Sequence, residues 1–444
     1  MKTLLVDAHI VNEGRTVSGN LLLDGKYIEA ILPNTAFPQN GKEIIADGQH
    51  ILPGCIDDQV HFREPGLTHK GEIFTESRAA VAGGITSFME MPNTVPNALT
   101  QQLLQDKYDI AANRSVANYS FFMGVSNDNA QEVLRTNKRD VCGVKIFMGS
   151  STGNMLVDNA ATLEHIFANC ELLIATHCED EATIKHNLAL AKEKYGDQIP
   201  VQMHPIIRDT EACYKSSSFA VELAKKHGTK LHVLHISTEK ELSLFRNDIP
   251  LSEKRITAEA CIHHLWFSEE DYASKGNFIK WNPAVKASTD RDAIFNAVLD
   301  GRIDVIATDH APHTLDEKSN SYAQAPSGGP LVQHALLAML EKHHEGKISL
   351  DRIVQLMSHN VATLFQIENR GFIREGYYAD LVLVDLKKST TVTRDTILAK
   401  CGWSPFEGQT FHSRVCTTFV NGNIVYNDGK LNDMYRGERL LFNR

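Results

Sequence analysis

The chain has 444 residues, of which 42% are hydrophobic and 23% are charged, a composition typical of a globular protein. Its 45 Lys and Arg are outnumbered by 55 Asp and Glu, which gives a net charge of −10. Because phosphate recognition needs a cationic face, this balance argues against a nucleic-acid-binding protein. No apolar run reaches the roughly 18 residues of a membrane span, and the apolar start is too short for a signal peptide. We therefore expect a cytoplasmic protein without membrane or nucleic-acid partners.

The eight cysteines form no Cys-x-x-Cys pair. This argues against both a disulfide framework and a thiolate zinc finger, so we expect reduced thiols. Histidine is more informative, because there are 20 copies and several of them end short apolar runs.

Both ends of the chain carry hairpin patterns. Near the start, two strand-like runs flank Asp24-Gly25, and near the end two such runs flank Asn421-Gly422, a strong type I′ turn signal. Chain ends usually lie close together at a domain surface. We therefore predict that residues 1–52 and 372–444 form one composite β-rich domain, a small β-sandwich built from both termini.

The middle of the chain, residues 53–371, alternates short β-branched runs with segments of helical periodicity. The expected strands cover residues 54–62, 85–91, 117–125, 143–148, 172–177, 231–235, 256–259 and 304–309. Eight repeated βα units of this length predict an α/β fold, a (β/α)₈ TIM barrel. A doubly wound open sheet is the alternative, but no GxGxxG turn follows the first strand. The polar segment 316–330 is predicted to be a mobile lid.

Chemistry in such a barrel gathers at the carboxyl ends of the strands. On the first strand Asp57, Gln59 and His61 alternate onto one face, and Lys145 interrupts the apolar fourth strand. Three more strands end in the metal-ligand types His177, His235 and Asp309. A lone histidine at a strand end is more often structural, but repetition at the same end of successive strands favours a metal centre.

Imidazole and carboxylate groups suit zinc, and a pair of such ions can activate a shared water. An unpaired buried ammonium is costly. A neutral Lys145 amine beside metal ions can instead take up carbon dioxide, and the resulting carbamate is an anion that can bridge them.

These segments together resemble dihydroorotases of the amidohydrolase superfamily: residues 57–66, Met91-Pro92-Asn93-Thr94, the Lys145 strand, 175–180 and 307–313. The resemblance covers nearly the whole chain, including Asn282-Pro283 and 404–406. It implies one or two zinc ions held by His61, N-carboxylated Lys145, His177, His235 and Asp309. It also implies substrate contacts from Arg63, Asn93, Asn282 and His313.

By the same resemblance, the protein would interconvert N-carbamoyl-L-aspartate and L-dihydroorotate in de novo pyrimidine synthesis, using metal-activated hydroxide, with Asp309 as the catalytic acid and base. A homodimer is expected. Arg63 would bind the substrate carboxylate, although a salt bridge to Glu64 is the simpler alternative. Asn93 could equally be a turn residue, and His263-His264 are expected to be structural.

One departure from the family pattern concerns the first strand. Where the family has His-x-His, this chain has Gln59 before His61, and an amide oxygen is a weak ligand for zinc. Three outcomes are open: a single tightly bound metal ion, compensation by Asp57 on the same strand face, or loss of catalysis.

Two other functions therefore compete with dihydroorotase activity. One is a related cyclic amidohydrolase of the hydantoinase or allantoinase type, against which the guanidinium of Arg63 argues. The other is a catalytically impaired dihydroorotase-like assembly partner, for example of aspartate carbamoyltransferase, supported by Gln59 alone.

Overall fold

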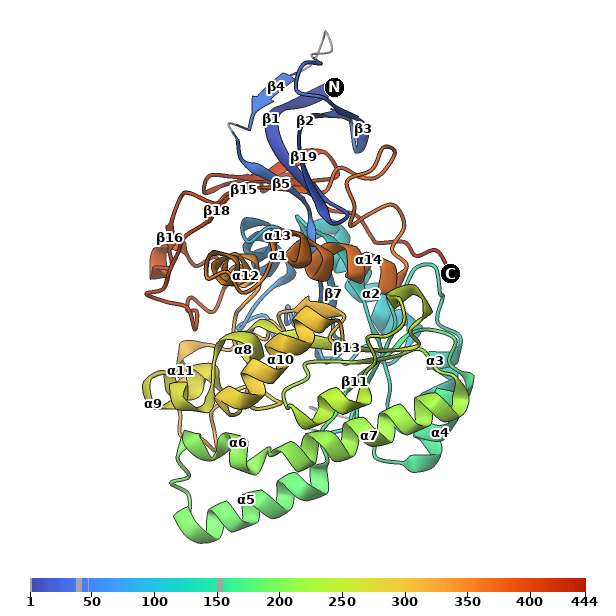
Figure 1. The fold of residues 1–444 in the computed structure, drawn as a ribbon. Helices are drawn as coiled ribbons and strands as arrows, with labels where there is room; N and C mark the ends of the chain where they lie inside the picture. Colours follow the sequence, from blue (N-terminus) through green and yellow to red (C-terminus); the bar gives the residue numbers. More distant parts are fainter. Residues whose placement is uncertain (1, 37–41, 47, 150–154) are drawn as a thin grey trace.

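The computed structural model describes residues 2–36, 42–46, 48–149 and 155–444. Its centre is a barrel of parallel strands in two sheets, ordered β6-β7-β8 and β9-β10-β11-β12-β13-β14. The two sheets join at both edges. Phe122 alone separates β8 from β9 in the chain, and a parallel bridge pairs Val60, in β6, with His310, just after β14. The structure thus confirms the predicted (β/α)₈ barrel (Figure 1).

Each expected barrel strand is present, although most are shorter than predicted. The observed strands are β6 (Cys55–Val60), β7 (Ile85–Glu90), β8 (Asn118–Phe121), β9 (Met123–Gly124), β10 (Val144–Phe147), β11 (Ile174–His177), β12 (Leu231–Val233), β13 (Ile256–Cys261) and β14 (Val305–Ala307). Helices cover their outer faces, so nearly every strand residue is buried.

The helices that follow the strands begin and end at recognisable capping residues. Asp180 and Asp209 accept backbone N–H groups of α5 and α7, and α7 ends at left-handed Gly228. The longer helices are α1 (Ile73–Ala82), α2 (Gln101–Arg114), α4 (Ala160–Asn169), α5 (Glu181–Tyr195), α7 (Thr210–His227), α10 (Ser288–Asp300) and α12 (Ala335–His344). The shorter ones are α3 (Ala130–Leu134), α6 (His204–Ile207), α8 (Ile262–Trp266), α9 (Tyr272–Lys275), α11 (Leu315–Lys318), α13 (Leu350–Val354) and α14 (Asn360–Phe365).

Both termini build one mostly antiparallel sheet beside the barrel, with blue and red strands together in Figure 1. Its strand order is β20-β19-β18-β15-β5-β1-β2-β3, and β4 also pairs with β1. The strands are β1 (Lys2–Asn12), β2 (Arg15–Asp24), β3 (Tyr27–Leu32), β4 (Lys42–Ile45), β5 (His50–Pro53), β15 (Leu381–Asp385), β18 (Arg414–Val420), β19 (Asn423–Asn427) and β20 (Lys430–Leu431). A further pair, β16 (Thr390–Thr391) and β17 (Thr410–Phe411), stands apart.

Both predicted hairpins are confirmed. Val420 pairs with Asn423, so Asn421 and Gly422 are the turn residues, with φ of 47° and 73° as a type I′ turn requires. In the first hairpin Asp24 pairs with Tyr27, which moves the turn one residue along from the predicted dipeptide.

The terminal sheet packs directly on the barrel. Leu52 and Val382 belong to the same buried cluster as barrel residues, and Thr418 Oγ1 donates to the carbonyl of Val81 at the end of α1. This packing holds the barrel segment against the terminal sheet. Within the described residues, no helix combines the length and apolar content needed to cross a bilayer.

Candidate active site

A cavity of about 580 Å³ opens at the carboxyl ends of the barrel strands. Its lining includes all the site residues predicted from the sequence: His61, Arg63, Asn93, Lys145, His177, His235, Asn282, Asp309 and His313. Gln59, Lys70 and Trp281 also line it. The volume suits a small ring compound.

The ends of β11 and β12 present a histidine pair. His177 Nδ1 lies 3.0 Å from His235 Nε2. His177 Nε2 donates to Glu179 Oε2 at 2.9 Å, and Glu179 is paired with Arg208. Burial opposes ionisation of Glu179, but Arg208 and His177 outweigh it and lower its pKa to about 2. The carboxylate therefore fixes the His177 tautomer and leaves Nδ1 free to bind a metal ion.

Lys145 faces the same cavity from β10. Its side chain is buried, with Nζ 4.6 Å from the centre of the Phe147 ring. Among the described residues the amine has no hydrogen bond or ion pair. Burial lowers the pKa of Lys145 to about 8. Part of the Lys145 amine is therefore neutral near pH 7, and the neutral amine is the form that reacts with carbon dioxide.

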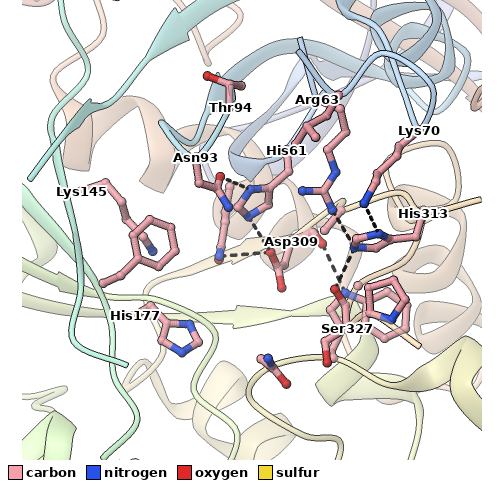
Figure 2. A pocket seen from close by; sticks show the side chains of 18 of the residues that line it. His61, Arg63, Lys70, Asn93, Thr94, Lys145, His177, Asp309, His313 and Ser327 are labelled. Atoms are coloured by element: carbon pink, nitrogen blue, oxygen red, sulfur yellow. Dashed lines mark hydrogen bonds and ion pairs between the residues drawn. The ribbon is translucent and has the colours of Figure 1, made fainter. Parts of the chain in front are cut away.

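On the other side of the cavity, His61 meets Asp309 (Figure 2), and Gln59 contacts the same carboxylate. His61 Nε2 lies 3.2 Å from Asp309 Oδ1, and Gln59 Nε2 donates to the same oxygen at 3.3 Å. His61 Nδ1 donates to Asn93 Oδ1 at 2.7 Å. Asn93 is thus more than a turn residue, because it orients the His61 ring.

Asp57 does not compensate for Gln59. Its carboxylate binds the backbone N–H and hydroxyl of Thr308 and the backbone N–H of Gln59, and it lies outside the cavity lining. The strand register shifts between Asp57 and Val60, so simple alternation fails there. The expectation that Asp57 shares the inner face with Gln59 and His61 is therefore wrong.

Three residues of the site have left-handed backbone: Arg63 (φ 69°), His235 (φ 39°) and Asp309 (φ 49°). This conformation is uncommon for residues other than glycine and concentrates at functional sites. For His235, the backbone N–H donates to buried Glu259 Oε1 at 2.9 Å, which helps to hold the turn.

Arg63 is a buried guanidinium that makes no ion pair among the described residues. Its Nε donates to the carbonyl of Pro312, and its Nη2 lies 3.0 Å from His313 Nε2. Glu64, the alternative partner, pairs instead with Arg114. Burial lowers the pKa of Arg63 to about 10, but it stays charged at neutral pH. A buried cation that faces a cavity and has no carboxylate partner among the described residues is suited to an anionic ligand.

His313 and Asn282 complete the polar lining. Lys70 Nζ lies 3.1 Å from His313 Nδ1, and the ring Nε2 lies 3.0 Å from the carbonyl of Ser327. Burial and neighbouring Arg63 lower the pKa of His313 well below its usual value, so the ring is neutral. Asn282 Oδ1 is buried and has no hydrogen-bond partner among the residues that the structure describes, which leaves an acceptor for a ligand N–H.

Two functional side chains were missed by the sequence reading. Lys70 lies in the loop after the first strand, and only folding brings it to His313. Glu179 could have been found, since it follows His177 by two residues and alternation places both on one face. His263 and His264 were correctly taken as structural: His263 stacks on Trp281 at 4.6 Å, and neither histidine lines the cavity.

Deeper in the barrel, buried His232 lies between two carboxylates. Its Nε2 is 3.2 Å from Asp58 Oδ2 and 3.8 Å from Glu259 Oε2, while Nδ1 lies 2.8 Å from Thr257 Oγ1. Burial disfavours the charged ring, but Asp58 and Glu259 outweigh it and raise the pKa of His232 to about 9. His232 is therefore protonated and offsets the carboxylates.

This raised pKa predicts that the protein loses stability in alkali. The folded state keeps the His232 proton up to about pH 9, whereas the unfolded chain releases it near pH 6.5. Below about pH 6.5 protonated His232 makes its full contribution to the free energy of unfolding, roughly 3 kcal/mol. This contribution disappears as the pH rises through 9. Thermal unfolding followed from pH 6.5 to 9.5 measures this. H232Q should flatten the decline and H186Q, at an exposed site, should not. A decline equally steep in H232Q would refute the assignment.

The segment 316–330, expected to be a mobile lid, is pinned to the barrel. Buried Lys318 donates to the carbonyls of Lys280, Pro326 and Gly328. Lys280 in turn donates to the carbonyls of Tyr322 and Ala325. Because Ser327 and Gly328 line the cavity, the two lysines shape its wall.

Replacing Lys318 by methionine should loosen this wall. Three carbonyls lose their donor, and each costs about 1–3 kcal/mol if left unpaired. We expect a rise in KM of at least about tenfold, together with faster proteolytic cleavage within 316–330. Steady-state kinetics and limited proteolysis measure the two effects, with K347M at an exposed lysine as the matched control. An unchanged KM would mean that the pinning is dispensable.

Comparison with known proteins agrees with this fold. A model of the amidohydrolase family matches residues 50–425. The chain therefore belongs to the amidohydrolase family.

Among its relatives are proteins named dihydroorotase. The one from Halobacterium salinarum is 33% identical over 428 residues, covering 95% of this chain and 96% of the relative. The one from Pyrococcus abyssi is 31% identical over 444 residues and covers 99% of both. An L-hydantoinase from Arthrobacter aurescens superposes with a TM-score of 0.92 at 24% identity over 97% of each chain. A dihydropyrimidinase from Brevibacillus agri superposes with a TM-score of 0.89 at 23% identity over both full chains. These two structures support the fold.

Proposed function

We propose that this protein is a dihydroorotase, a metal-dependent cyclic amidohydrolase of pyrimidine biosynthesis. It interconverts N-carbamoyl-L-aspartate and L-dihydroorotate. Relatives of this name align over nearly the whole chain at more than 30% identity. The observation that carries the proposal is Arg63, a buried cation that lacks a carboxylate partner among the described residues and faces the cavity beside metal-ligand side chains. Dihydroorotate supplies that carboxylate.

The donor types in the cavity fit a divalent ion, for which we propose zinc. His177 Nδ1 and His235 Nε2 are spaced as two ligands of one ion. Among the described residues, no three His, Cys, Asp or Glu ligand atoms converge in the cavity. A third donor is therefore needed, and Lys145 as a carbamate supplies it. His61 and Asp309 lie on the far side. When bound, zinc lowers the pKa of water and polarises a carbonyl oxygen.

Asp309 is the proposed catalytic acid and base. In hydrolysis its carboxylate takes a proton from the attacking water and delivers it to the ring nitrogen as the carbon–nitrogen bond breaks. Gln59 Nε2 donates to the carboxylate, and Trp281 Nε1 donates to the backbone carbonyl of Asp309. Ring closure reverses these steps.

Three side chains orient the ring. Arg63 presents two N–H groups that match the substrate carboxylate. The free Oδ1 of Asn282 accepts a ring N–H, and neutral His313 holds the Arg63 side chain in place. The charge of Arg63 makes its part of the cavity locally positive, which favours an acidic substrate despite the net charge of −10.

A hydantoinase is the second candidate, favoured by the close structural match to such enzymes. Its substrates need no carboxylate, so they leave the charge of Arg63 without a partner. Metal-loaded protein should therefore be assayed on dihydroorotate, N-carbamoyl-L-aspartate, hydantoin and allantoin side by side. We expect kcat/KM for dihydroorotate to exceed that for the neutral rings by at least about 100-fold. The reverse order would support a hydantoinase, and no turnover of any would favour the inactive assembly partner.

We further propose that the protein is a cytoplasmic homodimer, and two observations support this. All eight cysteines are free, which fits the reducing cytoplasm. Leu190, Ile206 and Phe219, on α5–α7, are partly exposed, and they support a homodimer that light scattering can test.

A further inference from the structure

The two sides of the cavity differ in how they can hold a metal ion. Figure 2 places Lys145 and His177 on one side and His61 with Asp309 nearer the centre. On the first side His177 and His235 present ring nitrogens 3.0 Å apart. With the Lys145 carbamate they provide three strong donors.

The second side provides only two such donors of its own and can at most share the carbamate. His61 and Asp309 are the strong ligand types there, and the third group of its own is the neutral amide of Gln59. Its Nε2 is directed at Asp309 Oδ1, and its Oε1 accepts from the Cys261 thiol at 3.7 Å. The amide oxygen therefore faces the barrel interior, and its N–H₂ end serves the carboxylate.

The remaining candidate for a third ligand is excluded by its contacts. Asp57 is saturated by Thr308 and the Gln59 backbone. Asp58, the adjacent acid, turns away to His232 deeper in the barrel. Among the described residues on this strand, His61 is left as the only strong ligand.

We infer that the active protein holds one tightly bound zinc ion, at Lys145, His177 and His235, and that Gln59 serves as a hydrogen-bond donor that positions Asp309. This inference rests on the proposed function of the same cavity. It predicts a mononuclear centre in which the Gln59 amide holds the catalytic carboxylate in place of a second ion.

The test is metal stoichiometry in the full-length protein. Wild type, Q59H, Q59A, H61A and H177A are loaded with zinc and bicarbonate, dialysed, and analysed by mass spectrometry of the metal. Wild type, Q59A and H61A should retain about one ion per chain, H177A should retain almost none, and Q59H should gain a second because imidazole restores a strong ligand. Circular dichroism and thermal melting establish that each variant is folded.

Two ions in wild type, with one in Q59A, would overturn the inference, because Gln59 would then be a ligand. One ion in both wild type and Q59H would also overturn it, since Gln59 would not be what limits binding. Kinetics give the positioning readout: Q59A should lower kcat at unchanged metal content, and Q59E should not recover it because a carboxylate cannot donate to Asp309. The stoichiometry is measured without substrate, so a protein with one ion and no dihydroorotate turnover would refute the proposed function alone.

Discussion

Replacing Lys145 by alanine is expected to remove both the bound metal ion and the activity. The amine is buried on β10 with no polar partner among the described residues, so the folded protein does not need it as an ion pair. As the proposed carbamate it would supply the third strong donor beside His177 and His235. Losing that anion should lower kcat/KM by at least about 10³-fold, because the ion stabilises transition-state charge by several kcal/mol.

Chemical rescue distinguishes this role from a structural one. The K145A cavity can admit acetate or propionate, whose carboxylate takes the place of the carbamate, and partial recovery of metal content and turnover should follow. K107A provides the contrast, because Lys107 is equally buried but already paired with Glu90 at 3.0 Å. Carboxylic acids should not rescue it. Full activity in K145A would remove the carbamate from the mechanism.

The second large effect is expected at Arg63. Methionine preserves the apolar stem but removes the guanidinium, leaving the substrate carboxylate without a partner. Removing one member of a buried charge pair costs about 2–5 kcal/mol, so KM for dihydroorotate should rise by about 100-fold or more. Lysine should not restore it, since an ammonium cannot bind a carboxylate in the bidentate manner.

Two controls make the Arg63 result specific. R291M, at a surface arginine on α10 that pairs with Asp292, should leave KM unchanged. Metal content of R63M should equal that of wild type, because Arg63 is not a ligand. If R63M bound dihydroorotate normally, another residue would recognise the substrate carboxylate. The argument from Arg63 against a hydantoinase would then no longer hold.

The site could be located from the sequence because barrel geometry repeats. His177, His235 and Asp309 each end a short buried run, and parallel strands of one barrel bring their carboxyl ends to the same mouth. Lys145 stood out because a charge within an apolar strand is costly. Asp57 was misplaced because the register shift after it leaves no mark in the residue pattern.

The sequence by itself determined the eight strands, the two terminal hairpins and the strand-end side chains that line the cavity, since each depends on local periodicity or on turn chemistry. Only the tertiary structure decided which way Gln59 faces, that Arg63 lacks an acidic partner among the described residues, and that Lys318 pins the segment 316–330. These facts depend on neighbours more than 200 residues away in the chain for Gln59 and Arg63, and on the folded path of the loop for Lys318. Local pattern carries no information about such contacts, because folding brings the partners together only when the barrel closes.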